Sequence, residues 1–215
     1  MTLLACLVAR DVRIAYGRGS AAMPVIFFLL VATLYPFAVG PDDQMISSTG
    51  GGVLWIAALL AALLPVDRLI LPDMEAGLLD QYAVRGAPDE MVVAAKMVAH
   101  WLSFAPPLLL AVIPAALLLR LDGDMLVRIE ISLLIGTAGL AALAVGTACL
   151  TASLRGAAAL AGLLMLPLAI PLLIFGAGSL GSGSAGALKL LAATTLLCVA
   201  GTPFAAGAAL RALRD

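Results

Sequence analysis

The segment Asp67–Lys96 has the sequence DRLILPDMEAGLLDQYAVRGAPDEMVVAAK and carries three of the chain's 12 basic residues and six of its 13 acidic residues. Long apolar runs without charged residues flank it on both sides. Because a run of about 20 apolar residues can cross the hydrocarbon core of a bilayer, we expect this charged segment to lie outside the membrane. It is therefore the part of the chain best suited to contact a water-soluble partner.

The composition of the whole chain supports a membrane location. Of its 215 residues, 63% are hydrophobic and only 12% are charged, whereas soluble domains carry about 25% charged residues. A large buried core does not explain that difference, so the composition predicts an integral membrane protein. The net charge of −1 and the lack of a basic arm argue against a nucleic-acid partner.

Six runs free of Asp, Glu, Lys and Arg are long enough to span the membrane. They are Gly19–Pro41, Gln44–Val66, Met97–Leu119, Ile131–Leu154, Gly156–Leu188 and Leu190–Leu210. We therefore predict an all-α, polytopic fold, with six transmembrane helices forming a single domain over residues 19–215. The Gly- and Ser-rich stretch 176–186 predicts a flexible loop after the fifth span.

Residues 1–18 are predicted to form an amphipathic helix in the headgroup plane. Within 2–16, Leu3, Leu7 and Ile14 share one side, while Arg10 and Arg13 lie on the other. A signal peptide is the alternative, because residues 38–40 (Ala-Val-Gly) could serve as a cleavage site. Its basic region would be unusually long, so we expect the segment to remain in the mature protein.

The distribution of Lys and Arg predicts the orientation of the spans. Nine of these residues fall at the chain ends and in the loops after the second and fourth spans, and three fall in the remaining loops. This bias places both termini and the segment Asp67–Lys96 on the cytoplasmic side of the membrane.

Within the charged segment, residues 73–82 are expected to form a short docking helix. Asp73 would cap its first turn and Glu75 would favour the positive end of the helix dipole. Gly86 and Pro88 would end this element, and Asp89 would cap a second helix that enters the third span. The alternatives are a helix that docks on a cytoplasmic subunit and a solvated loop whose apolar face rests on lipid.

No catalytic or metal site is predicted. The only lysines, Lys96 and Lys189, follow Ala and Leu, so the phosphate-binding motif G-x-x-x-x-G-K-[ST] is absent and ATP hydrolysis would require a partner. There is no G-x-S-x-G motif, and Ser182 and Ser184 are expected on the side of the membrane opposite the only histidine. The three cysteines have no metal-ligand or redox spacing.

The order of several motifs resembles the haem exporter protein B family (cytochrome c maturation protein B), over nearly the whole chain. These motifs are residues 27–29 (FFL), 34–37 (LYPF), 55–60 (WIAALL), 95–101 (AKMVAHW), 166–175 (LPLAIPLLIF) and 203–204 (PF). The docking segment matches through Arg68, Asp73, Gly77, Leu79 and Gln81. It departs from the family where Ile70, Leu71 and Pro72 replace an expected charged residue.

This resemblance implies the membrane permease subunit of an ABC-type complex in the bacterial inner membrane. Such a subunit would act with a cytoplasmic ATPase and other cytochrome c maturation membrane proteins, in two copies, and would couple ATP hydrolysis to haem delivery or to release of a haem chaperone. The expected docking residues are Arg68, Asp73, Met74, Glu75, Gly77, Leu78, Leu79, Gln81 and Tyr82. The alternatives are an ABC-2-type exporter for another lipid or amphipathic substrate, and a membrane scaffold that transports nothing.

His100 is the one candidate for contact with haem. It lies one turn after Lys96 at the cytoplasmic end of the third span, and histidine can ligate haem iron. The alternative is an interfacial pair with Trp101, in which Lys96 extends to the membrane surface. We favour a role for this region in relaying motion from the docking helix into the third span.

Overall fold

The computed structural model describes residues 3–17, 19, 21–40, 42–154, 156–181 and 185–212. All the elements in these residues are helical, and six helices are long and apolar enough to cross a membrane. The chain is a multi-pass membrane protein, and the prediction of an all-α fold with six spans is confirmed. The spanning helices are α2 (Ala22–Val39), α3 (Asp43–Leu63), α6 (Asp89–Leu118), α7 (Gly123–Thr151), α8 (Ala157–Gly178) and α9 (Ala185–Ala212).

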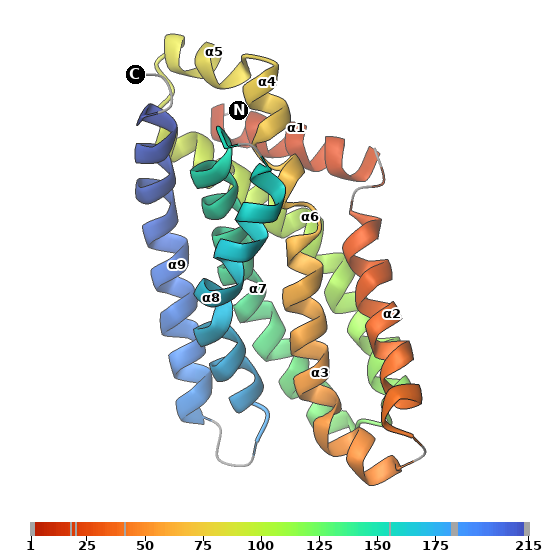
Figure 1. Ribbon diagram of the computed structural model, residues 1–215. Helices are drawn as coiled ribbons and strands as arrows, with labels where there is room; N and C mark the ends of the chain where they lie inside the picture. Colours follow the sequence, from red (N-terminus) through yellow and green to blue (C-terminus); the bar gives the residue numbers. More distant parts are fainter. Residues whose placement is uncertain are drawn as a thin grey trace.

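These six helices run lengthwise beside one another, while the shorter helices gather at one end of the bundle (Figure 1). The short elements are α1 (Leu3–Gly17), which lies across this end, α4 (Leu71–Glu75) and α5 (Leu78–Val84). The 3-10 turn η1 (Val66–Arg68) connects α3 to α4. We call this end, where the last turns of α9 also lie, the docking end.

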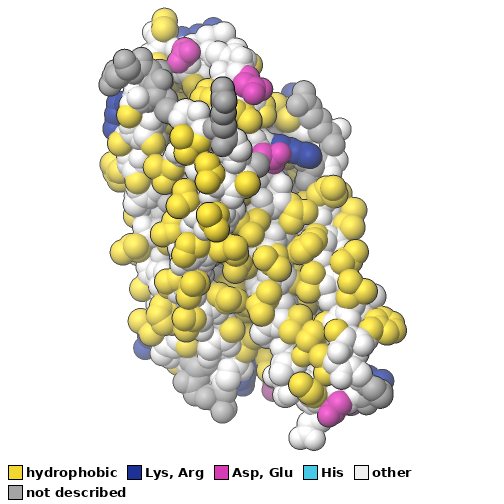
Figure 2. Space-filling model, viewed as in Figure 1, with side chains coloured by type: hydrophobic (Ala, Val, Ile, Leu, Met, Phe, Trp, Pro, Cys, Tyr) yellow, Lys and Arg dark blue, Asp and Glu magenta, His cyan; other side chains and the backbone are white. Residues whose placement is uncertain are grey.

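Side-chain chemistry follows this arrangement. Hydrophobic side chains cover the long sides of the bundle, and charged side chains gather near its two ends (Figure 2). Many of the apolar side chains on the outside are highly exposed, such as Phe37, Leu117 and Leu197. A lipid environment accounts for this exposure, because hydrocarbon solvates apolar side chains that water would not.

Two helix boundaries differ from the sequence prediction. α7 begins at Gly123, ahead of the charge-free run 131–154, and Asp122 caps it by accepting a hydrogen bond from the Met125 backbone N–H at 2.7 Å. The first turns of α7 thus contain charged residues. This is possible because a membrane helix can extend beyond the hydrocarbon core into water. α8 continues to Gly178 and α9 begins at Ala185, so both ends of the predicted flexible loop 176–186 are helical. Residues 182–184 of that loop lie outside the described residues.

The centre of the bundle is packed around Trp55 on α3. Its side chain is fully buried, and its indole N–H donates a hydrogen bond to the hydroxyl oxygen of Ser132 on α7 at 3.0 Å. A Cβ added at Gly136 on α7 or at Gly176 on α8 would overlap the Trp55 ring. These two glycines therefore let α7 and α8 approach the indole that α3 inserts between them.

Candidate functional site

The docking segment folds as two short helices rather than the single helix predicted for residues 73–82. Gly77 separates α4 from α5 and adopts a left-handed conformation (φ 66°, ψ 17°), which glycine reaches without the strain of a Cβ. The four-residue spacing of Met74, Leu78 and Tyr82 predicts that they share one face of a single helix, but Met74 lies on α4 and the other two lie on α5. The segment is a bent pair of helices lying across the docking end.

The predicted roles of Asp73 and Asp89 as helix caps are wrong. α4 begins at Leu71 after Ile70, which provides no side-chain cap, and α6 begins at Asp89 after Pro88. Asp73 lies inside α4, where its carboxylate binds cations of two other helices instead of the N–H groups of its own. Asp73 does not cap α4 because the helix begins two residues before it, which leaves its carboxylate to bind these cations.

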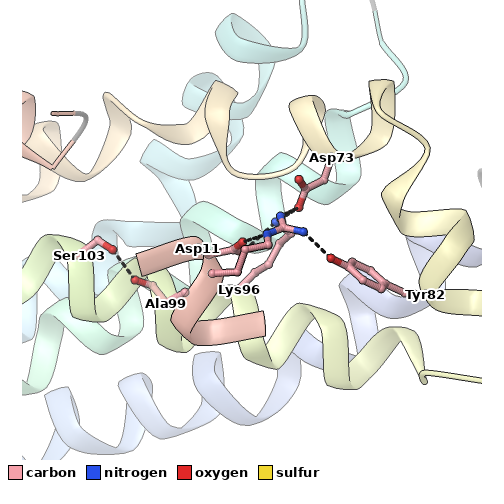
Figure 3. Close-up of polar contacts among 7 residues, drawn as sticks. Asp11, Asp73, Tyr82, Lys96, Ala99 and Ser103 are labelled. Carbon is pink, nitrogen blue, oxygen red and sulfur yellow. Dashed lines mark hydrogen bonds and ion pairs between the residues drawn. The ribbon is translucent and has the colours of Figure 1, made fainter. Parts of the chain in front are cut away.

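An ion network joins α4 to α1 and α6 (Figure 3). The Asp73 Oδ2 atom lies 2.6 Å from Lys96 Nζ on α6 and 2.5 Å from Arg10 Nη2 on α1. Asp11 on α1 completes the network, with its two carboxylate oxygens 2.8 Å from Arg10 Nε and 3.1 Å from Lys96 Nζ. Two carboxylates and two cations thus hold three helices together.

Arg10 extends the network to the second docking helix. Its Nη1 group donates a hydrogen bond to the hydroxyl oxygen of Tyr82 on α5. Burial lowers the pKa of Arg10, but the hydrogen bond to Asp73 and the negative charge of Asp11 raise it above the ordinary value. The guanidinium therefore stays charged at every physiological pH, and it binds α1 to both α4 and α5.

The low exposure of the network makes it structurally important. Only 8% of the Lys96 side chain and 13% of the Asp73 side chain are exposed. Removing one partner of a buried ion pair leaves the other charge uncompensated, which costs much more than the loss of a surface pair. The network is therefore expected to stabilise the packing of α1, α4 and α6 against one another.

Apart from Asp73 and Gly77, the predicted docking residues divide into two groups. Glu75 and Gln81 are exposed, as is Arg68 at the end of η1, and they are accessible to a partner. Leu79 is buried, and Met74 and Tyr82 are half-buried against the hydrophobic core. Leu78 is half-buried as well, so the apolar members of the predicted set attach the segment to the bundle.

A cavity of about 400 Å³ lies directly beside the ion network. Its lining comes from α1, α2, α4, α6 and the connection from α3 to α4, and includes Arg10, Asp11, Arg68, Asp73, Lys96 and His100. His100 is buried, stacks on Phe104 with ring centroids 5.7 Å apart, and has no hydrogen-bond partner for Nε2 within the described part of the chain. Trp101 instead turns to α7, where its indole N–H donates to Thr137 at 3.2 Å. His100 and Trp101 therefore do not act as a pair.

Sequence reasoning missed the part played by α1. The sequence pattern places Arg10 on the polar face of an isolated amphipathic helix and assigns no role to Asp11. The available signal was one acidic residue in an otherwise basic segment, together with a lysine in the first turns of a membrane span. Which carboxylate meets that lysine depends on how α1 crosses the bundle.

Comparison with known proteins identifies the relatives of this chain. The family model described as "CcmB protein" matches residues 1–213. Heme exporter protein B of Bradyrhizobium diazoefficiens is 42% identical over 218 residues, covering 98% of each chain. Heme exporter protein B of Paracoccus denitrificans is 44% identical over 211 residues, covering 95% of this chain and 97% of that protein. The Escherichia coli K12 protein of the same name is 36% identical over 207 residues, covering 94% of each chain.

Proposed function

Because this chain belongs to the CcmB protein family, we propose that it is a membrane transport subunit that serves haem in cytochrome c biogenesis and works with an ATP-hydrolysing partner. The names of the full-length relatives support haem as the substrate. Any ATP hydrolysis would come from a partner, because the sequence has no nucleotide-binding lysine loop. The resemblance to haem exporter protein B inferred from the sequence is confirmed.

The observation that carries the proposal is the position of the α4–α5 segment. The segment lies at the end of the bundle beyond the spans (Figure 1), and its outer surface is exposed at Glu75, Asp80, Gln81, Val84 and Arg85. Val84 is the most exposed of the large hydrophobic residues in this segment, at 90%. A valine so exposed among charged neighbours is suited to a small apolar contact with a water-soluble protein.

The inner side of the same segment supports mechanical coupling. Leu79 and Tyr82 contact the core, while Asp73 is fixed to α1 and α6 by the ion network. Nucleotide-driven movement of the partner would push α4 and α5, and the network would carry that displacement into the third span. The coupled step is either haem delivery or release of a haem chaperone.

The same proposal sets the orientation in the bacterial inner membrane. In this orientation the docking end and both termini face the cytoplasm. Lys and Arg are enriched in cytoplasmic loops, and the ATPase partner requires the ATP of the cytoplasm. Other cytochrome c maturation membrane proteins and a second copy of this chain complete the complex. Haem is the transported or delivered substrate of this complex, not a resident cofactor.

The experiment is co-purification of the tagged full-length chain with its ATPase subunit in mild detergent. Val84→Arg should reduce ATPase recovery by roughly tenfold, which corresponds to about 1.4 kcal/mol of binding free energy. The matched control is Val127→Arg, because Val127 is also exposed but lies on α7 at the opposite end of the bundle. Equal recovery with the two variants would argue against docking through α5.

The partners recovered with the unchanged protein separate the remaining alternatives. An ATPase together with haem-handling proteins supports the proposal, particularly if the complex shows a Soret absorption band. An ATPase without such proteins favours an exporter of another amphipathic substrate. A preserved complex without any ATPase contradicts coupling to ATP and favours a scaffold.

A further inference from the structure

The cavity beside the ion network changes from polar to apolar along α6. Lys96 lies at its outer part, His100 follows one turn deeper, and Phe104 follows after another turn. At 1.5 Å per residue, this lining extends for about 12 Å along the helix. Because α6 spans the membrane, the gradient runs from headgroup depth towards the hydrocarbon, as the polarity of a lipid molecule does.

The charges that line the cavity do not cancel. Asp11 and Asp73 are both engaged by Arg10 and Lys96, which leaves Arg68 as an additional cation. Arg68 has only Asp67 as an ion-pair partner within the described residues, at 3.9 Å, and 60% of its side chain is exposed. The cavity lining itself carries three cations against two carboxylates, because Asp67 lies outside the lining. The exposed Arg68–Asp67 pair contributes little, so Arg68 remains available to a ligand with a negative group.

A second observation also points to a ligand. Among the described residues, His100 Nε2 is one of two buried side-chain polar atoms without a hydrogen-bond partner. Buried polar atoms are nearly always hydrogen-bonded, and Nε2 is shielded from the cavity although His100 lines it. A rotation of the imidazole ring would bring this atom to a group bound in the cavity. The apolar residues Ile14, Pro24 and Phe104 line the same space and suit a hydrocarbon chain.

We propose that this cavity binds one anionic membrane phospholipid, whose phosphate contacts Arg68, whose ester region reaches His100, and whose acyl chain packs against Pro24 and Phe104. Cavities of 300–1,000 Å³ take drug-sized groups, so the site holds the headgroup region and the upper part of a chain while the rest of the lipid stays in the bilayer. Basic pockets between helices near the cytoplasmic surface are suited to this type of headgroup. Because α1 lines the cavity, the lipid would fix the interfacial helix against α6.

The test is native mass spectrometry of the purified full-length chain, combined with thermal unfolding in nanodiscs. We expect one phospholipid to remain bound to the unchanged protein, and phosphatidylglycerol to raise the melting temperature above that in phosphatidylcholine. Inorganic phosphate and a neutral alkyl detergent, added separately, should not reproduce the shift. Binding of free phosphate alone would overturn the requirement for a lipid.

Variants distinguish this site from general attraction to an anionic membrane. Arg68→Gln should reduce phosphatidylglycerol retention severalfold, whereas Arg13→Gln should not, because Arg13 is an exposed cation on α1 that does not line the cavity. His100→Phe, which removes the unpaired nitrogen and fills part of the space, should also reduce retention. These readouts need no ATPase, so they succeed or fail independently of the proposed transport function.

Two results would overturn the proposal. Equal lipid retention by Arg68→Gln and Arg13→Gln would show that the phosphate is not held in the cavity. A Soret band that His100→Phe abolishes, in a sample without retained phospholipid, would assign the cavity to haem instead.

Discussion

Lys96 Nζ lies 2.6 Å from Asp73 Oδ2, so the beginning of the third span is ion-paired with the first helix of the docking segment. This pair is mostly shielded from water, and each member also contacts a charged residue of α1. The network therefore links α1, α4 and α6 directly. This relationship supports coupling between the docking end and the membrane bundle.

The first prediction concerns that pair. Asp73→Asn and Lys96→Gln should each lower thermal stability, because each leaves a charge of the network without its partner. The double variant should recover part of the loss, with a coupling free energy of about 1–3 kcal/mol. Unfolding of the four proteins in detergent measures this coupling, and strictly additive losses would contradict it.

The second prediction concerns the bend between α4 and α5. Gly77→Val should loosen the segment, because a β-branched residue is strained at positive φ. Hydrogen exchange over residues 71–84 should accelerate while exchange in the spans stays unchanged. Gly77→Asn should behave closer to the unchanged protein since Asn tolerates this conformation, and equal effects of Val and Asn would exclude backbone strain as the cause.

The third prediction concerns the centre of the bundle. Gly136→Ala should cost about 1–3 kcal/mol, the usual range for overpacking, because the new methyl group would overlap the Trp55 ring. Gly201→Ala is the control, since a Cβ there meets no atom within 4 Å among the described residues. Thermal unfolding followed by tryptophan fluorescence measures both, and comparable losses would contradict the packing argument.

The fourth prediction concerns orientation. In a Cys6→Ala background, a cysteine replacing Val84 should react with a membrane-impermeant maleimide only after the cytoplasmic face is opened. A cysteine replacing Val127 should react in intact spheroplasts. The reverse pattern would overturn the cytoplasmic assignment of the docking end.

Sequence patterns were sufficient for the spans because their signal is local. The cost of placing charge in hydrocarbon acts on each residue separately, so long charge-free runs identified six membrane helices without any knowledge of their neighbours. The buried position of Leu79 was not predicted in the same way. It depends on the bend at Gly77, which the expectation of a single helix omitted.

The sequence by itself determined that this is a six-span membrane protein of the CcmB family with one charged segment between its second and third spans. Only the tertiary structure decided that Asp73 faces inward and that Arg10, Asp11 and Lys96 meet it. It also decided that His100 lines a cavity. The reason is physical: hydrophobicity is a property of each residue in its solvent, whereas an ion network requires groups 63 and 23 positions apart to meet. That meeting depends on how α1 crosses the docking end.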